Sequence, residues 1–154
     1  FGVVVTARGH HEGQREHEQS RVHAGQYTRG LMSPRVSGAC HCGRVRFEVE
    51  GAPAGVVECN CSICRRTGYL HWFVPQARFH LLAGADALTT YTFGTGVAQH
   101  TFCATCGIKA FYTPRSHPDQ LSVNVRCLEG VDLDALEVTP FDGDNWEQNI
   151  DQIR

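Results

Sequence analysis

Alternation of apolar and charged residues is the most regular pattern along the chain. In the stretch RVRFEVE, residues 44–50, Val45, Phe47 and Val49 alternate with charged positions, which is typical of a β-strand with one buried face. Other short stretches are rich in aromatic and β-branched residues, and these are LHWFV, LTTYTF, AQHTFC, IKAFYT and LSVNV. Such residues favour strands, so the pattern predicts a mainly β fold.

Helical periodicity is weak throughout the chain. The best helical candidates are single turns at residues 62–67 and 132–136. Many short strands without long helices between them predict an antiparallel sandwich or a small barrel. The acidic end of the chain contains Phe141 and Trp146, which we expect to pin this segment to the surface of the domain.

Residues 1–35 differ in composition from the rest. They are polar, rich in His, Gln, Arg and Gly, and show no strand or helix period. A segment with so little apolar area does not offset the entropy of ordering, so we expect a disordered extension, followed by one domain at residues 36–154. Met32 is the only methionine, and translation could start there. The histidines of this segment could instead bind a metal, and they are His10, His11, His17 and His23.

Charge and hydropathy narrow the possible partners and locations. The net charge of -2 gives no basic excess for binding nucleic acid. No apolar run approaches the roughly 20 residues that span a bilayer, and the first residues lack the basic region and cleavage site of a signal peptide. We therefore expect a cytoplasmic protein with no nucleic-acid partner and no membrane association.

Cysteine is unusually frequent, with eight in the chain. Disulfides in a secreted domain are one interpretation, but C-x-C pairs close poorly because the short backbone rarely permits the required torsion. Two pairs share a glycine directly after the second cysteine: Cys40 and Cys42 before Gly43, and Cys103 and Cys106 before Gly107. Glycine there permits a positive φ and turns backbone N–H groups toward the thiolates. These two zinc knuckles predict a closed structural site of four thiolates; an iron–sulfur centre or free thiols are the alternatives.

A second group of cysteines has no such glycine, and it consists of Cys59, Cys61 and Cys64. Three thiolates leave one tetrahedral position open, as in catalytic zinc sites. Either Cys127 could close the site, or the three could be ordinary reduced thiols. A substrate thiolate would suit the open position. Arg65 and Arg66 could then receive its carboxylates by bidentate pairing, the other interpretation being a solvated helical turn.

The stretches SGACHCGRVRFEV, CNCSICRRTG and TFCATCGI resemble the glutathione-dependent formaldehyde-activating enzyme family, which shares its domain with centromere protein V. The resemblance implies a Mss4-like (β-tent) fold of short antiparallel strands with zinc knuckles. It implies two zinc ions per chain: a structural one on Cys40, Cys42, Cys103 and Cys106, and a catalytic one on Cys59, Cys61 and Cys64. The implied activity is that of a carbon–sulfur lyase, the reversible formation of S-(hydroxymethyl)glutathione from glutathione and formaldehyde.

A base would help to carry the proton of the thiol. His71 and His100 are candidates by residue type, although each could be a structural histidine. The polar residues that could line a pocket are Asn60, Ser62, Tyr91 and Asn124. Two alternatives to an enzyme stay open: a non-catalytic, zinc-stabilised module that binds proteins, as centromere protein V allows, and a glutathione carrier without turnover.

Overall fold

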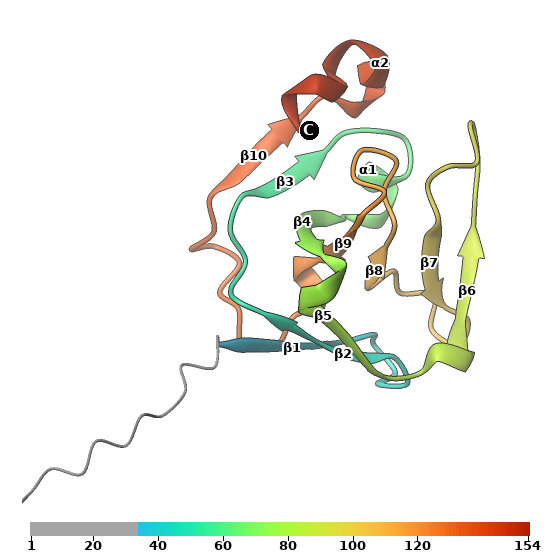
Figure 1. Ribbon diagram of the computed structural model, residues 1–154, viewed down its shortest axis with the longest axis vertical. Coiled ribbons are helices and arrows are strands. Elements are labelled where there is room, and N and C mark those ends of the chain that lie inside the picture. The colour runs from blue at the N-terminus through green and yellow to red at the C-terminus, as the bar shows by residue number, and fades with distance from the viewer. Residues whose placement is uncertain (1–33) are drawn as a thin grey trace, which may run out of the picture. The chain divides into compact units, whose positions relative to one another are not determined.

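Three small sheets hold together the part of the chain that the structure, a computed structural model, describes, residues 34–154 (Figure 1). The first has the order β1-β2-β5, with β1 at Arg35–Ala39, β2 at Arg46–Glu50 and β5 at Phe79–Ala83. The second has the order β10-β3-β4-β9-β8, with β3 at Val56–Cys59, β4 at Leu70–Pro75, β8 at Phe111–Tyr112, β9 at Gln120–Asn124 and β10 at Val138–Phe141. The third pairs β6, Leu88–Tyr91, with β7, His100–Cys103. The predicted mainly β fold is confirmed.

Helices in the described residues are single turns. The α-helical turns are α1 at Cys64–Thr67 and α2 at Trp146–Asn149, and the 3-10 turns are η1 at Gln76–Arg78, η2 at Ala85–Ala87, η3 at Val125–Cys127, η4 at Gly143–Asn145 and η5 at Ile150–Gln152. The turn predicted at residues 62–67 is therefore present as α1. The one predicted at 132–136 is not a helix: a single reverse turn forms there, in which Leu136 N donates to Leu133 O at 3.4 Å. No helix in residues 34–154 combines the length and apolarity needed to cross a bilayer.

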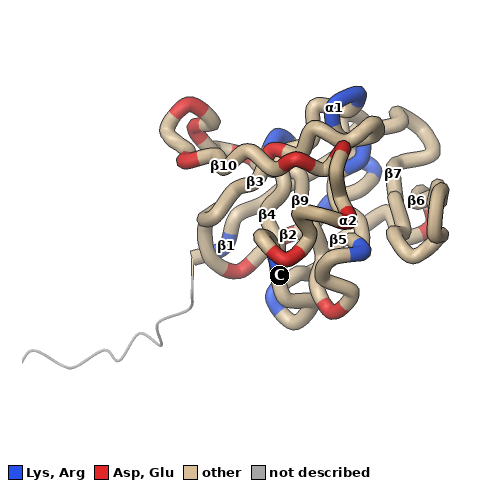
Figure 2. Tube along the Cα trace, turned by 90° about the horizontal axis from the view of Figure 1, so that it is seen from above, with Lys and Arg blue, Asp and Glu red and all other residues tan. Residues whose placement is uncertain are grey.

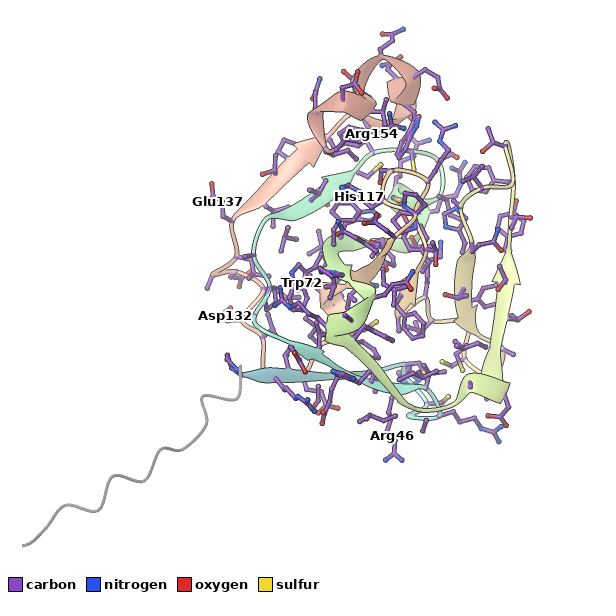
Figure 3. All side chains as sticks on the ribbon, in the orientation of Figure 1. Arg46, Trp72, His117, Asp132, Glu137 and Arg154 are labelled. Atoms are coloured by element: carbon purple, nitrogen blue, oxygen red, sulfur yellow. The ribbon has the colours of Figure 1, made fainter. Side chains whose placement is uncertain are left out.

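The alternating pattern of β2 sorts its side chains as predicted. Val45, which precedes the strand, and Phe47 and Val49 within it are fully buried. Arg46 points outward, whereas Trp72 of β4 lies in the interior (Figure 3). Since successive side chains of a strand face opposite ways, this alternation alone decides which face of the first sheet meets the core.

One strand pair departs from the antiparallel expectation. β10 pairs with β3 in parallel, with Val138 opposite Val56 and Phe141 opposite Cys59. Parallel neighbours need a long crossover connection, and here the chain passes through β4 to β9 and a loop before β10 returns to the edge of the sheet. The turn after β10 is thereby brought beside the cysteines that follow β3.

The buried side chains form two clusters. The larger lies among the sheets and includes Val45, Phe47, Val49, Trp72, Val74, Phe111 and Val123. The smaller surrounds the second cysteine group and consists of Cys59, Cys64, Tyr69, Tyr112 and Phe141, with Trp146 packed against it. The ring of Trp146 meets that of Phe141 edge-on at 5.7 Å, so these two residues do pin the end of the chain.

The predicted disordered extension, residues 1–35, lies outside the described residues except for its last two positions. Arg35 already belongs to β1. The histidines singled out as possible metal ligands in that segment and the hypothetical start at Met32 also fall outside the described residues, so these statements stay predictions.

Candidate metal centres and the adjoining cavity

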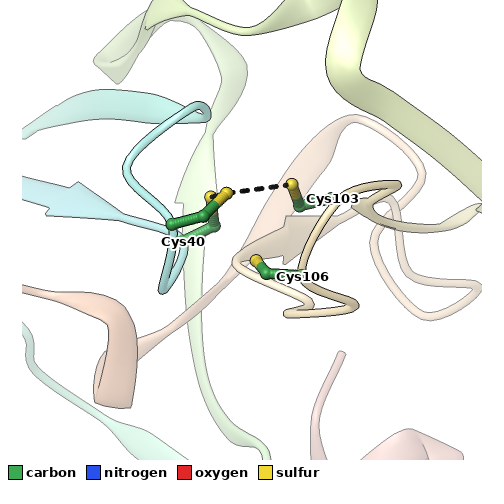
Figure 4. A group of neighbouring side chains, drawn as sticks. Cys40, Cys103 and Cys106 are labelled. Atoms are coloured by element: carbon green, nitrogen blue, oxygen red, sulfur yellow. Dashed lines mark hydrogen bonds between the residues drawn. The ribbon is translucent and has the colours of Figure 1, made fainter.

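Four cysteines from two distant loops converge. Cys40 and Cys42 lie in the loop between β1 and β2, Cys103 ends β7, and Cys106 lies in the loop before β8. Their four Sγ atoms all lie within 4.8 Å of one another. The Cys40 and Cys42 sulfurs are 3.5 Å apart, and those of Cys42 and Cys103 are 3.7 Å apart. Figure 4 shows Cys40 facing the pair formed by Cys103 and Cys106 across the gap between the two loops.

Both glycines that mark these loops have the expected left-handed backbone. Gly43 has a φ of 73° and Gly107 a φ of 75°. The tight turns direct backbone N–H groups at sulfur: Val45 N donates to Cys40 Sγ at 3.3 Å, and backbone donation from Cys106 lowers the pKa of Cys103. N–H groups aimed at sulfur favour the thiolate. The predicted knuckle geometry is confirmed for both loops.

The second cysteine group forms where β3 ends. Cys59 is the last residue of β3, and Cys64 is the first residue of α1. With Cys61, which lies between them, they place three Sγ atoms within 4.8 Å of one another. Cys61 N also points at Cys59 Sγ, at 3.5 Å. The three thiols therefore lie close together because the end of β3 is followed within a few residues by the helical turn α1.

The turn after β10 forms the floor beneath this group. A Cβ atom at Gly143 would collide with Cys59 Sγ and lie 3.1 Å from Cys61 Cβ. Asn60 holds the turn in place, since its Nδ2 donates to Asp142 Oδ1 at 3.0 Å and its Oδ1 accepts from Asp144 N at 2.9 Å. The parallel strand pair thus fixes the second group from a segment about eighty residues away, in keeping with the long crossover that such a pair requires.

Both groups have the composition and spacing for a tetrahedral metal. Zinc binds thiolates at about 2.3 Å, which separates sulfur ligands by about 3.8 Å. The sulfur separations of 3.5 Å and 3.7 Å in the first group agree with this value. Thiolate sulfur is also the donor that zinc, copper(I) and iron–sulfur centres prefer. The first group could hold a metal with four protein ligands and the second with three.

Thiol protons are unevenly shared in the second group. Hydrogen bonds from Cys59 and Cys64 lower the pKa of Cys61 to about 2. The contact with Cys61 raises the pKa of Cys59 to about 11, and the contacts with Cys59 and Cys61 raise the pKa of Cys64 further still. The cluster therefore holds one thiolate readily even as the bare protein, and a bound cation would draw off the remaining protons.

A cavity of about 430 Å³ opens directly beside the second group. Cys59, Cys61 and Cys64 all line it. The rest of its wall includes seven aromatic rings, and these are His71, Phe73, Phe93, His100, Tyr112, Phe141 and Trp146. The first group has no residue among those that line this cavity. A ligand bound in this cavity would therefore reach the three-cysteine group.

The two histidines named as possible bases both line the cavity, and both are buried. His71 is 3% exposed and His100 is 4% exposed. Burial lowers the pKa of each imidazole to about 4. At neutral pH both rings are therefore uncharged.

The arginines proposed for the substrate carboxylates take other positions. α1 carries both of them on an exposed surface (blue in Figure 2). Arg66 Nη1 donates to Ser62 O at 2.6 Å, and Arg65 Nη1 lies 3.9 Å from Asp144 Oδ2. Neither is among the residues that line the cavity. The structure thus does not bring them to the cavity wall.

Of the polar residues predicted to line a pocket, two line a cavity and two do not. Ser62 lines the main cavity, and Asn124 lines a separate one of about 180 Å³. Asn60 and Tyr91 line neither. Cys127 belongs to neither cysteine group; burial, together with Cys40 and Cys106, raises its pKa to about 11. It therefore lies toward the four-cysteine group and not where it would complete the other.

Sequence reasoning missed Arg115 at the cavity. Its side chain is 25% exposed, its Nη2 lies 2.8 Å from Glu147 Oε1, and its guanidinium carbon lies 4.8 Å from the centre of the Trp146 ring. Arg115, Trp146 and Glu147 all line the cavity. The loop after β8 and the turn α2 meet only in the fold, so no local spacing links these residues to the cysteines.

Comparisons with known proteins agree with this arrangement. A model of the family described as "Glutathione-dependent formaldehyde-activating enzyme" matches residues 35–141. A Halomonas elongata protein, provisionally named a glutathione-dependent formaldehyde-activating enzyme, is 34% identical over 80 residues, which cover 46% of this chain and 51% of that protein. The chain thus spans about half the length of this curated relative.

A crystal structure of a Rhodobacter sphaeroides protein is similar as well, with 44% sequence identity and a TM-score of 0.62. The match covers 68% of this chain and 97% of that one. The family match extends over most of the chain and contains both cysteine groups. The chain belongs to the glutathione-dependent formaldehyde-activating enzyme family.

Proposed function

We propose that this protein adds the thiol of glutathione to formaldehyde, a reversible reaction of the carbon–sulfur lyase class that gives S-(hydroxymethyl)glutathione. One observation carries the proposal. Three cysteine sulfurs, enough to hold a metal but one short of a tetrahedral set, line a cavity large enough for a small molecule. Sites that keep a coordination position open are the reactive ones among zinc proteins.

We assign zinc to both cysteine groups, giving two ions per chain. Cys40, Cys42, Cys103 and Cys106 would hold a structural ion, and Cys59, Cys61 and Cys64 a catalytic one. When bound at the second group, zinc favours the thiolate form of an incoming thiol. The apolar and aromatic side chains of the cavity wall contribute by limiting the access of water.

Arg115 is the residue to which we assign a carboxylate of the substrate, in place of Arg65 and Arg66. It is the basic side chain of the cavity wall and sits over the face of Trp146. Its present partner, Glu147, is largely exposed, with 81% of the side chain accessible. A pair with one strongly exposed partner contributes little stability, so a substrate carboxylate can replace Glu147 at small cost and pair with the guanidinium.

Exchange NMR tests the proposed activity. Magnetisation transfer between glutathione and its formaldehyde adduct is recorded at increasing protein concentration, because the adduct also forms without a catalyst. We expect the exchange rate to rise in proportion to the protein. A rate that does not change with added protein, in a sample shown by calorimetry to bind glutathione, would reject catalysis and leave a carrier.

Cys61→Ser is the matched variant for this experiment. It removes one ligand of the second group and leaves the four-cysteine group unchanged, so metal analysis should show a fall from two zinc ions per chain to one. Glutathione binding and exchange should be lost together. Binding that survives with only one zinc would contradict the assignment of the thiol to the second group.

A further inference from the structure

His71 has a buried nitrogen with no partner. Its Nδ1 lies 2.9 Å from Ser122 Oγ across the β4–β9 pair. Its Nε2 is the one buried side-chain nitrogen or oxygen atom in the described part of the chain that has no hydrogen bond. Leaving such a group unsatisfied costs about 1–3 kcal/mol, and native proteins that keep one usually have a use for it. The ring lines the cavity, so a molecule bound there is a possible partner for it.

The contact with Ser122 indicates which nitrogen carries the proton. Ser122 is fully buried, and its hydroxyl proton needs an acceptor. The nearby Tyr69 hydroxyl is a donor to Ser122 O, at 2.7 Å. Of the groups near Ser122 Oγ, which also include the hydroxyls of Tyr69 and Tyr112, we take His71 Nδ1, at 2.9 Å, as the acceptor. A neutral imidazole that accepts at Nδ1 carries its hydrogen on Nε2.

Lys109 acts on His100 in the same way. Its Nζ lies 3.4 Å from His100 Nδ1 and stands over the rings of Tyr69 and Tyr112, 6.0 Å and 5.6 Å from their centres. Lys109 is buried, and no carboxylate within residues 34–154 forms an ion pair with it. A lysine ammonium can only donate, so Nδ1 of His100 accepts and Nε2 carries the hydrogen.

The two imidazoles line the same cavity and contact a common neighbour. The ring centre of Tyr112, which also lines the cavity, lies 4.7 Å from that of His100 and 6.0 Å from that of His71. Lys109 lines the separate, smaller cavity, whereas both histidines line the main cavity, as the three cysteines do.

We infer that His71 and His100 are catalytic residues that donate hydrogen bonds from Nε2 to the carbonyl oxygen of the aldehyde, with Ser122 and Lys109 as positioning residues; this inference rests on the proposed function. Sequence reasoning considered the same two histidines as bases. Donors aimed at the oxygen on which charge develops are commonly the largest single contribution to this kind of catalysis.

The step balances without any further reactant. The thiol sulfur forms a bond to the carbonyl carbon, and the π electron pair of the C=O bond moves to the oxygen. The two N–H groups stabilise the negative charge on that oxygen. The oxygen then takes up one proton, equal to the one that the thiol released, and nothing is oxidised or reduced. In the reverse direction the same donors stabilise the same charge as the carbon–sulfur bond breaks.

Burial supports the role of donor over that of base. It lowers the pKa of both rings to about 4. Such an imidazole is a weak proton acceptor at neutral pH, but it keeps its Nε2 hydrogen and can donate it. Neutral imidazole used as a hydrogen-bond donor to a carbonyl group is an established catalytic device.

Nitrogen-15 NMR of the zinc-loaded protein without substrate tests the tautomers. Long-range couplings between ring nitrogens and ring protons distinguish Nε2–H from Nδ1–H, and the His71→Gln and His100→Gln variants assign the signals. We expect Nε2–H for both residues at pH 7, and a mixed tautomer for His71 in Ser122→Ala. An Nδ1–H tautomer at either residue in the wild type would overturn the inference.

Exchange kinetics then separate a donor from a base. A glutamine amide can place an N–H near the position of a histidine Nε2–H but cannot accept a proton, whereas phenylalanine can do neither. We expect His71→Phe to lower the exchange rate about 100-fold and His71→Gln to stay within about tenfold of wild type, both with unchanged glutathione affinity. Equal losses in the two variants would overturn the donor role.

Two controls keep the test decisive. His80→Gln, on a half-buried strand position away from the cavity where the ring pairs with Glu50, should match the wild type. If His71→Phe does not fold, the corresponding pair at His100 gives the same comparison. A wild-type protein without catalysed exchange would reject the proposed function, and the tautomer measurement, which needs no turnover, shows separately whether the donor arrangement exists.

Discussion

The two cysteine groups use the same ligand atom at the same spacing and differ in their surroundings. Each holds its sulfurs within 4.8 Å. The four-cysteine group is built from two glycine turns, has Cys42 exposed at the surface and joins the first sheet to the third, whereas the three-cysteine group lines a cavity of about 430 Å³. Under the proposed function, ligand number and contact with the cavity, and not ligand chemistry, separate the structural from the reactive role.

Loss of the four-cysteine group should have the largest effect. In Cys106→Ser the loops that carry Cys40 and Cys103 lose their common tie, and metal binding to such a site contributes on the order of 10 kcal/mol to folding. We expect no cooperative thermal transition by circular dichroism. Cys61→Ser, the matched change in the other group, should unfold cooperatively close to the wild type. Equal destabilisation by the two variants would show that the groups do not differ as described.

Acid should destabilise the folded protein through His71, a residue of the cavity wall. Burial lowers the pKa of His71 from its ordinary value of 6.5 to about 4, so between these values the unfolded chain binds more protons than the native one, and stability falls as the pH falls. Over that window the wild type should lose about 3 kcal/mol more than His71→Gln.

Urea titrations of both proteins at pH 6.5 and pH 4 measure this difference. Protonation of the cysteine ligands affects the two proteins alike and drops out of the comparison. Parallel losses would mean that His71 is not held neutral in the folded state.

Arg115 tests whether the cavity side recognises the substrate by charge. We expect Arg115→Gln to weaken glutathione binding about tenfold, which corresponds to about 1.4 kcal/mol, and to leave binding of 2-mercaptoethanol, which has no carboxylate, unchanged. Isothermal titration with both thiols measures the two affinities. Arg65→Gln is the control, because Arg65 is exposed and does not line the cavity. A larger loss of glutathione affinity in Arg65→Gln than in Arg115→Gln would show that the substrate carboxylate binds to α1 and not to Arg115.

Substitution of Cys127 should have the smallest effect on stability, and it tests whether this cysteine belongs to either metal site. It is half-buried and belongs to neither, so Cys127→Ala removes only a small apolar contact. We expect a loss of about 1 kcal/mol in chemical unfolding and two zinc ions per chain, as in the wild type. A fall to one zinc would make Cys127 a ligand and close the position that we leave to the substrate.

Local pattern was sufficient for several elements and for the sorting of the cysteines. The buried alternation of Val45, Phe47 and Val49 and the positive φ of Gly43 and Gly107 follow from neighbours in the sequence. The expectation of a helix at 132–136 was wrong, because the backbone there forms a single reverse turn closed by a hydrogen bond from Leu136 N to Leu133 O. Nothing in the local sequence distinguishes such a turn from the first turn of a helix.

The amino-acid sequence by itself determined that this is a mainly β protein of the formaldehyde-activating family with cysteines in a set of four and a set of three. Spacing and glycine position carry that information because both act within a few residues of backbone. Tertiary structure alone decided that Gly143 lies under Cys59, that Arg115 rather than Arg65 or Arg66 lines the cavity, and that His71 and His100 share its wall. These contacts arise from the parallel return of β10 and from strand pairing across long loops, which no short-range pattern encodes.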